Sequence, residues 1–169
     1  MFGYFPNDYV DSPYSIDYHK LWQAGFRLLL FDIDNTLVPH GADGTPESLA
    51  LLKRVEKMGF KVILISNNNN DRILRFLQGE EIEYIAEADK PDPGAILKAM
   101  NVSGVGKEQA IMIGDTTHTD ILAANRSGIS SILVKYIGYD STERKGIRRT
   151  IEKFMLHFFP IFRKPTLFR

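Results

Sequence analysis

The stretch FRLLLFDIDNTL, residues 26–37, decides the fold of this chain because an apolar run ends there in two closely spaced carboxylates. A continuous run of this kind is typical of a strand covered on both faces, as in parallel sheets. Asp32 and Asp34 then lie at the carboxyl end of the strand, where open α/β sheets bind ligands. Because residues i and i+2 of a strand share a side, both acids can point at one spot. Two carboxylates about 4 Å apart repel by roughly 4 kcal/mol at an effective dielectric of about 20, so a cation or a proton is expected between them.

An Asp-x-Asp triplet alone has a second interpretation, because acids after a strand also serve as turn or helix-cap residues. The remaining sequence has to decide between a site and a turn. Strand and helix patterns alternate along it, with strands expected before Asp32 and at residues 60–65, 84–86, 110–113 and 131–134. This alternation predicts a doubly wound α/β fold, a parallel sheet of about five strands with helices on both faces.

The composition is that of an ordinary globular protein with one domain. The chain has 169 residues, 44% of them hydrophobic and 25% charged, enough for one core. The 21 basic and 21 acidic residues cancel, so the overall charge does not indicate a nucleic-acid partner. There is no cysteine, which excludes disulfides and thiolate zinc sites. No apolar run approaches the roughly 20 residues that span a bilayer, and the first residues lack a signal-peptide pattern, so a cytoplasmic location is expected.

The chain divides into three segments by composition. Residues 1–25 are an aromatic, loop-like extension that we expect to pack outside the core, with one short helix over residues 16–24. Residues 26–134 hold the alternating strands and helices. Residues 141–169 form a basic, amphipathic C-terminal segment; from Lys135 onward nine Lys/Arg stand against three Asp/Glu, a local balance of +6.

Polar residues follow three of the predicted strands. They are Asp32 and Asp34, then Ser66 and Asn67, then Asp115 and Asp120. Because parallel strands gather their carboxyl ends at one edge, these distant residues are expected to become neighbours. Several carboxylates with no cysteine and no histidine cluster form a hard-oxygen site, which selects magnesium rather than zinc. The sequence therefore predicts a Mg²⁺ site of the kind that accompanies phosphate oxygens.

These residues resemble the four motifs of the haloacid dehalogenase (HAD) superfamily of phosphotransferases. The resemblance rests on Asp32-x-Asp34-x-Thr36, on Ser66, on Lys90 followed by Pro91, and on Gly114-Asp115-x4-Asp120. Each motif alone is weak, but all four occur in order, each in its expected place on the alternating pattern. The competing interpretation is a catalytically silent α/β domain.

The resemblance implies a metal-assisted phosphatase reaction. Asp32 would be the nucleophile that forms an aspartyl-phosphate, and Asp34 would protonate the leaving oxygen and later deprotonate the attacking water. An acid at this second position favours a phosphatase over a dehalogenase. Magnesium would be held by the Asp32 carboxylate, the Asp34 backbone carbonyl and the Asp115 carboxylate. Asp120 would be a further ligand or lie just outside the ligand set.

The resemblance also implies a group of phosphate-binding residues. The Ser66 hydroxyl and the Asn67 backbone N–H would hold the phosphoryl oxygens, and Lys90 would offset the charge that develops on nucleophile and phosphate. Thr36 belongs to this group and is expected to steady the loop and Asp34. We interpret Asn68 and Asn69 as turn residues. Open roles remain for His40, His118, Asn125 and Arg126.

The spacing of the motifs leaves no room for a large cap domain. Only 29 residues separate Thr36 from Ser66, and 23 separate Ser66 from Lys90. In HAD enzymes such insertions close over the site, so an open site is expected here. An open site suits a substrate anchored in something large, such as a protein, a nucleic-acid end or a lipid headgroup.

The C-terminal segment points to lipid among these. In residues 146–159, apolar side chains form one helical stripe with basic residues beside it, a profile typical of peripheral contact with the inner face of a membrane. The alternative is a last helix docked on the sheet. SNNN at residues 66–69 and Asp120-Ile-x3-Asn-Arg-x-Gly resemble the YqeG-type HAD phosphatases, relatives of phosphatidylglycerophosphate phosphatases. Ala123-Ala124 stands where that family often has Gly-Gly.

The resulting hypothesis is a magnesium-dependent phosphomonoesterase that acts on phosphatidylglycerophosphate or a similar large or membrane-anchored substrate. Two alternatives stay open. One is a phosphatase for phosphoproteins or nucleic-acid ends, which the open site also suits. The other is a membrane-associated binding module that keeps the HAD fold without turnover.

Overall fold

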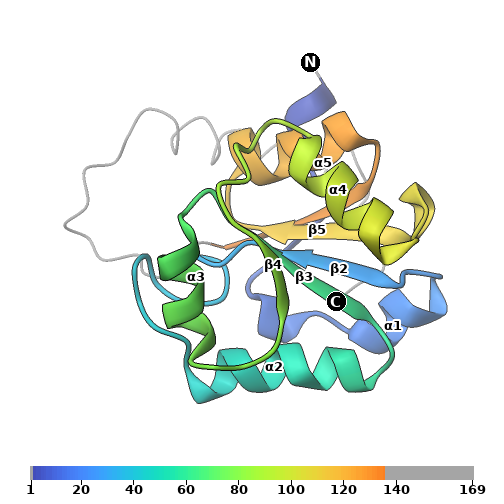
Figure 1. The fold of residues 1–169 in the computed structure, drawn as a ribbon. Helices are drawn as coiled ribbons and strands as arrows, with labels where there is room; N and C mark the ends of the chain where they lie inside the picture. The colour runs from blue at the N-terminus through green and yellow to red at the C-terminus, as the bar shows by residue number, and fades with distance from the viewer. Residues whose placement is uncertain (1, 136–169) are drawn as a thin grey trace.

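The computed structural model of the protein describes residues 2–135. Its centre is a six-stranded sheet in the order β1-β6-β5-β2-β3-β4, in which every neighbouring pair is parallel (Figure 1). The strands are β1 (Asp8–Val10), β2 (Leu28–Phe31), β3 (Lys61–Ile65), β4 (Glu83–Ile85), β5 (Ala110–Gly114) and β6 (Ser130–Val134). The doubly wound α/β fold predicted from the alternating pattern is confirmed.

Helices cover both faces of the sheet (Figure 1). One face carries α1 (Tyr18–Gln23), α2 (Pro46–Lys57) and α3 (Asn70–Leu77), and the other carries α4 (Gly94–Ser103) and α5 (Leu122–Ser127). Short helical turns complete the described chain: η1 (Phe2–Tyr4), η2 (Pro13–Ser15), η3 (Lys107–Gln109) and η4 (Thr117–Ile121). Of these, η4 has π-helical hydrogen bonding and leads directly into α5.

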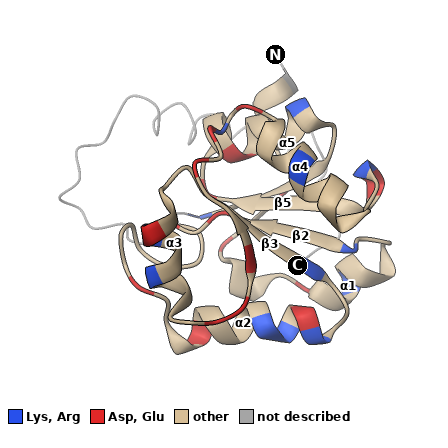
Figure 2. Cartoon of the chain, viewed as in Figure 1, with Lys and Arg blue, Asp and Glu red and all other residues tan. Residues whose placement is uncertain are grey.

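The apolar run of β2 explains why the sheet needs two helical layers. Leu29 and Phe31 pack into the cluster that contains α1, α2 and α3, whereas Leu28 and Leu30 pack into the cluster with α4 and α5. All four side chains are fully buried. Neither β2 nor β5 contains a charged residue, and the charged residues of the described chain lie on helices, on loops and at the ends of other strands (Figure 2). A strand buried on both faces in this way has no polar alternation.

The expectation of a loop-like N-terminal extension was incomplete, because this segment supplies β1, the sixth strand. Asp8 and Val10 align with Ile132 and Val134 of β6. The strand is only three residues long, too short for a periodic signal. It forms because β6 would otherwise be an edge with unpaired backbone groups.

Most helix boundaries follow their capping residues. Thr45 caps α2 through a reciprocal pair with Ser48, with a proline at the start of the helix. Asn69 caps α3, because its side chain accepts from Arg72 N at 3.0 Å. Helix α4 ends at Ser103, where Gly104 adopts a left-handed backbone.

The predicted amphipathic segment over residues 141–169 lies outside the described residues. Among residues 2–135, the structure contains no helix with the length and apolar character to cross a membrane.

Candidate active site

The chain leaves β2 in a tight turn that separates the first two acids. The backbone N–H groups of residues 36–38 all donate to the Ile33 carbonyl, at 2.9 to 3.3 Å. Asn35 adopts a left-handed backbone with φ of 65°, which asparagine tolerates better than most residues. Because β2 ends at Phe31, the strand alternation does not extend to Asp34. Asp32 and Asp34 have different hydrogen-bond partners, so each acid has its own network.

Asp32 is joined to Lys90 in a buried chain of charged groups. The Lys90 ammonium donates to Asp32 Oδ1, to Asp120 Oδ1 and to the Ile65 carbonyl, each at 2.7 Å. Burial lowers the pKa of Lys90, but the carboxylates of Asp120 and Asp32 outweigh it and hold the pKa above its ordinary value. Lys90 is therefore a permanent cation between two acids that come from different strand ends.

The backbone around Lys90 is held by two further side chains. Asn67 Nδ2 donates to the Lys90 carbonyl at 3.0 Å, and Lys90 N donates to Asn67 Oδ1 at 2.8 Å. Arg126 Nη1 donates to the Pro91 carbonyl at 3.1 Å. Asn67 thus has a side-chain function that the sequence did not reveal, and Arg126 supports the same loop from α5.

Asp32, Asp115 and Asp120 form a cluster that could hold a metal ion. One carboxylate oxygen from each lies within 4.8 Å of the other two. Thr36 Oγ1 lies 3.2 Å from Asp32 Oδ2 and 3.4 Å from Asp115 Oδ1. The Thr36 hydroxyl thus contacts two members of the cluster, a role that the sequence did not reveal.

Asp120 owes its position to the end of β5. Its Oδ2 accepts from Thr116 N at 3.1 Å, while its Oδ1 accepts from Lys90. A Cβ on Gly114 would lie 2.5 Å from the Asp120 Cβ, far inside van der Waals contact. The glycine before Asp115 is therefore required for close approach of the Asp120 side chain to the backbone.

The electrostatics of the cluster fit a bound divalent cation. Burial raises the pKa of Asp32 to about 6, although Lys90 opposes the shift. Burial, reinforced by Asp120 and Asp32, raises the pKa of Asp115 to about 8. Lys90 alone therefore does not offset the cost of ionising Asp32 and Asp115 in this buried position. Their oxygen-only donor set suits Mg²⁺, and a bound Mg²⁺ would supply the missing positive charge.

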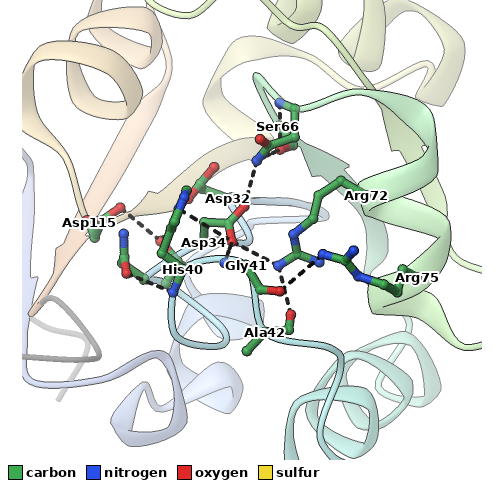
Figure 3. A network of polar contacts seen from close by, with 12 residues as sticks. Asp32, Asp34, His40, Gly41, Ala42, Ser66, Arg72, Arg75 and Asp115 are labelled. Atoms are coloured by element: carbon green, nitrogen blue, oxygen red, sulfur yellow. Dashed lines mark hydrogen bonds and ion pairs between the residues drawn. The ribbon is translucent and has the colours of Figure 1, made fainter.

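Asp34 is held in a second network, shown in Figure 3. Its Oδ1 accepts from Gly41 N at 2.7 Å and from Arg72 Nη2 at 2.8 Å, and its Oδ2 accepts from Asn68 Nδ2 at 2.6 Å. The solvent-exposed His40 ring adds a longer contact, with Nδ1 at 3.8 Å from Oδ1. Asp34 thus pairs with a cation of its own, as the expected repulsion between the two acids requires.

Ser66 connects this second network to the end of β3. The buried Ser66 Oγ accepts from Asn68 N at 3.2 Å and lies 3.3 Å from Asn68 Nδ2. Asn68 is therefore part of the site, and its interpretation as a turn residue missed this bridge to Asp34.

Arg72 also belongs to this site, although it lies outside the sequence motifs. It lies in the first turn of α3, where Asn69 is the N-cap. A cation in the first turn of a helix opposes the helix dipole. This unfavourable position was the sequence signal that could have indicated a specific role for Arg72. Among the residues left open, Asn125 has a structural contact, because its Nδ2 donates to the carbonyls of Gly3 and Phe5 at 2.7 and 3.1 Å. This contact ties the N-terminal segment to α5.

Known proteins resemble this chain in sequence and in fold. A family model described as HAD-hydrolase-like matches residues 87–152. The chain is 33% identical over 132 residues to the probable phosphatase YqeG of Bacillus subtilis (strain 168), covering 78% of this chain and 77% of that protein. It is 32% identical over 131 residues to the chloroplastic phosphatidylglycerophosphate phosphatase 1 of Chlamydomonas reinhardtii, covering 71% of this chain and about half, 48%, of that protein.

A solved structure supports the fold assignment. An uncharacterized protein from Listeria monocytogenes serotype 4b superimposes with a TM-score of 0.54 at 20% identity, over 78% of this chain and 98% of that one. The four motifs stand on the matching parallel sheet, and the YqeG relative is matched over most of its own length. The chain therefore belongs to the YqeG-type phosphatases of the haloacid dehalogenase superfamily.

Proposed function

We propose that the protein is a magnesium-dependent phosphomonoester hydrolase that works through an aspartyl-phosphate on Asp32. The observation that carries this proposal is the buried Asp32–Lys90–Asp120 chain, with both contacts to the ammonium at 2.7 Å, next to Asp115. A carboxylate beside a permanent cation and further acids suits a phosphoryl acceptor, because phosphoryl transfer depends mainly on positioning and on charge stabilisation.

The chain's own residues account for both halves of the reaction. An Asp32 oxygen attacks phosphorus in line, the bond from phosphorus to the leaving oxygen breaks, and Asp34 gives that oxygen a proton. Asp34 then removes a proton from a water that attacks the aspartyl-phosphate, which releases phosphate and regenerates Asp32. Lys90 offsets negative charge on the nucleophile throughout.

The metal and phosphate ligands follow from the same arrangement. The Asp32 and Asp115 carboxylates and the Asp34 backbone carbonyl would hold Mg²⁺. Asp120 would be a further ligand or orient the set through Lys90. When bound, Mg²⁺ supplies Lewis-acid stabilisation of the phosphoryl oxygens. The Ser66 hydroxyl and the Asn67 N–H would bind those oxygens.

We further propose that the substrate is phosphatidylglycerophosphate or a similar large or membrane-anchored phosphomonoester. The interval from Thr36 to Ser66 contains a loop, α2 and β3, and the interval from Ser66 to Lys90 contains α3 and β4, so no cap domain is inserted between these motifs. The Chlamydomonas relative carries the name of a phosphatidylglycerophosphate phosphatase. The basic segment over residues 141–169 would supply peripheral contact with an anionic membrane surface.

A substrate panel tests this proposal. Purified protein with Mg²⁺ should release inorganic phosphate from phosphatidylglycerophosphate in mixed micelles, and Asp32→Asn should abolish the release. Hydrolysis of a soluble sugar phosphate with no action on the lipid would exclude the lipid as substrate. The panel also includes a phosphopeptide and a 5′-phosphorylated oligonucleotide, because the open site admits both.

The binding-module alternative has a different signature. It would show binding to anionic vesicles unaffected by Asp32→Asn, with no phosphatase activity in the wild type. That combination would contradict the enzymatic proposal as a whole.

A further inference from the structure

We propose that Arg72 is a positioning residue that holds the Asp34 carboxylate in place for proton transfer to the leaving group. The inference rests on the proposed phosphatase reaction and adds to it a residue from α3. Arg72 lies six residues beyond Ser66 and outside the motifs quoted from the sequence.

The Arg72 side chain is buried against Asp34. Arg72 and Asp34 expose only 9% and 8% of their surfaces, and Arg72 Nη2 lies 2.8 Å from Asp34 Oδ1. Within the part of the chain that the structure describes, Arg72 Nε and Nη1 have no hydrogen-bond partner. A cation buried with two unused donor groups is unfavourable unless a specific charge pair compensates for its burial. Among the described residues, Asp34 is the acid that pairs with the Arg72 guanidinium.

Arg72 also holds the loop that contacts Asp34. Arg72 Nη2 donates to the Ala42 carbonyl at 2.8 Å, and the neighbouring Gly41 N donates to Asp34 Oδ1 at 2.7 Å. Figure 3 shows Arg72 reaching from α3 to both the acid and this loop. One guanidinium therefore fixes the carboxylate directly and also fixes the loop whose Gly41 N–H binds the same carboxylate oxygen.

The two carboxylate oxygens of Asp34 have different hydrogen-bond donors. Among the described residues, Oδ1 accepts from the N–H of Gly41 and from the guanidinium, whereas Oδ2 accepts from the Asn68 amide alone. Oδ1 is thus occupied by donors, and Oδ2 is the oxygen left to exchange a proton with a substrate. The Asn68 amide also lies 3.3 Å from Ser66 Oγ. This places Oδ2 on the side of the residue that we assign to the phosphoryl group.

Arg75 provides a matched control on the same helix. Its Nη2 donates to the Gly41 carbonyl at 3.1 Å, and its Nε lies 2.9 Å from Asp43 Oδ1. Among the interactions of the described residues, Arg75 therefore contacts the same loop without contacting Asp34. A variant of Arg75 perturbs the loop and the charge of α3 but leaves the direct pair intact.

The test compares two substrates of similar shape, p-nitrophenyl phosphate and benzyl phosphate. The first has a leaving group that departs without a proton, and the second needs an acid. The value of kcat/KM reports the steps up to transfer of the phosphoryl group to Asp32. The ratio of the two kcat/KM values does not depend on the fraction of enzyme that is folded, so a partly unstable variant still gives an answer.

Arg72→Met should lower kcat/KM for benzyl phosphate by about 100-fold, the low end of general-acid contributions, and for p-nitrophenyl phosphate by less than about 5-fold. Asp34→Asn should shift the ratio in the same direction. Arg72→Lys, which keeps the charge but not the planar fork, should lie between Arg72→Met and wild type. Arg75→Met should keep the wild-type ratio.

If the ratio of the two kcat/KM values in Arg72→Met stays at the wild-type value, whether both activities fall equally or neither falls, the positioning role is overturned. Those outcomes leave the proposed function intact if wild type hydrolyses both esters and Asp32→Asn hydrolyses neither. A wild type inactive on the entire substrate panel, or an Asp32→Asn variant that keeps turnover, would overturn the proposed function and this inference together.

Discussion

At the scale of single residues, the site depends on which acid holds which cation. Asp32 pairs with Lys90 at 2.7 Å and Asp34 pairs with Arg72 at 2.8 Å. Acids that follow strands could be foreseen as neighbours, because the topology of a parallel sheet requires it. Arg72 could not be foreseen as the partner of Asp34, because its position in the sequence does not say how far its long side chain reaches from the helix.

Removal of the Lys90 charge should destabilise the protein strongly. Lys90→Met leaves Asp32 and Asp120 buried without their shared cation, and breaking a buried pair from one side costs about 3–5 kcal/mol. Urea unfolding at neutral pH in a chelator measures the change in the free energy of unfolding.

The control for this variant is Lys53→Met. Lys53 pairs with Glu80, but its side chain is 48% exposed, and exposed pairs contribute at most about 1 kcal/mol. Equal effects of the two substitutions would show that the contacts of Lys90 do not stabilise the fold.

At the scale of elements, the strands with long apolar runs were predictable and the short edge strand was not. β2, β3 and β5 are continuous buried segments, and their sequences alone indicate strands. β1 has three residues, and its pairing is decided by the exposed edge of β6. The π-helical turn η4 was also unforeseen, because hydrogen bonding in this turn depends on how Asp120 fits beneath the end of β5.

Gly114→Ala should displace Asp120 and impair the site. The added methyl group would collide with the Asp120 side chain, so the carboxylate must move away from Lys90. We expect a loss of about 1–3 kcal/mol in unfolding free energy, typical of overpacking, and a phosphatase rate at least about 10-fold lower.

Gly106→Ala serves as the control for this substitution. A Cβ at Gly106 would come no closer than 3.4 Å to the flexible end of Glu108, so stability should change by less than about 0.5 kcal/mol. Wild-type activity in Gly114→Ala would contradict the need for close approach at the end of β5.

At the scale of the whole molecule, the fold and the lack of a large cap between the motifs followed from chain length, alternation and the intervals between motifs. These properties depend on the whole sequence and do not change when one helix boundary is misjudged. The substrate does not follow from them, because selectivity depends on side chains around the opening rather than on the sheet.

Metal-free protein should lose stability as the pH rises from about 4 to 8. The folded-state pKa values of Asp32 and Asp115 are raised to about 6 and about 8. The folded protein therefore holds protons that the unfolded chain has already released, and the free energy of unfolding falls with pH over this interval. Urea unfolding in EDTA at several pH values measures the slope.

Two comparisons isolate the cause of this slope. Asp115→Asn should flatten it, and saturating Mg²⁺ should restore stability at pH 8 more than at pH 5, because only ionised acids bind the metal. A slope that is the same in wild type and Asp115→Asn would mean that other groups control it.

The triple contact of the Lys90 ammonium also has a consequence for synthesis on the ribosome. Its two acidic partners lie 58 residues earlier and 30 residues later in the sequence. A nascent chain that has emerged only as far as Lys90 can join it to Asp32 but not to Asp120. The contacts of the Lys90 ammonium are thus completed only after Asp120 has been translated.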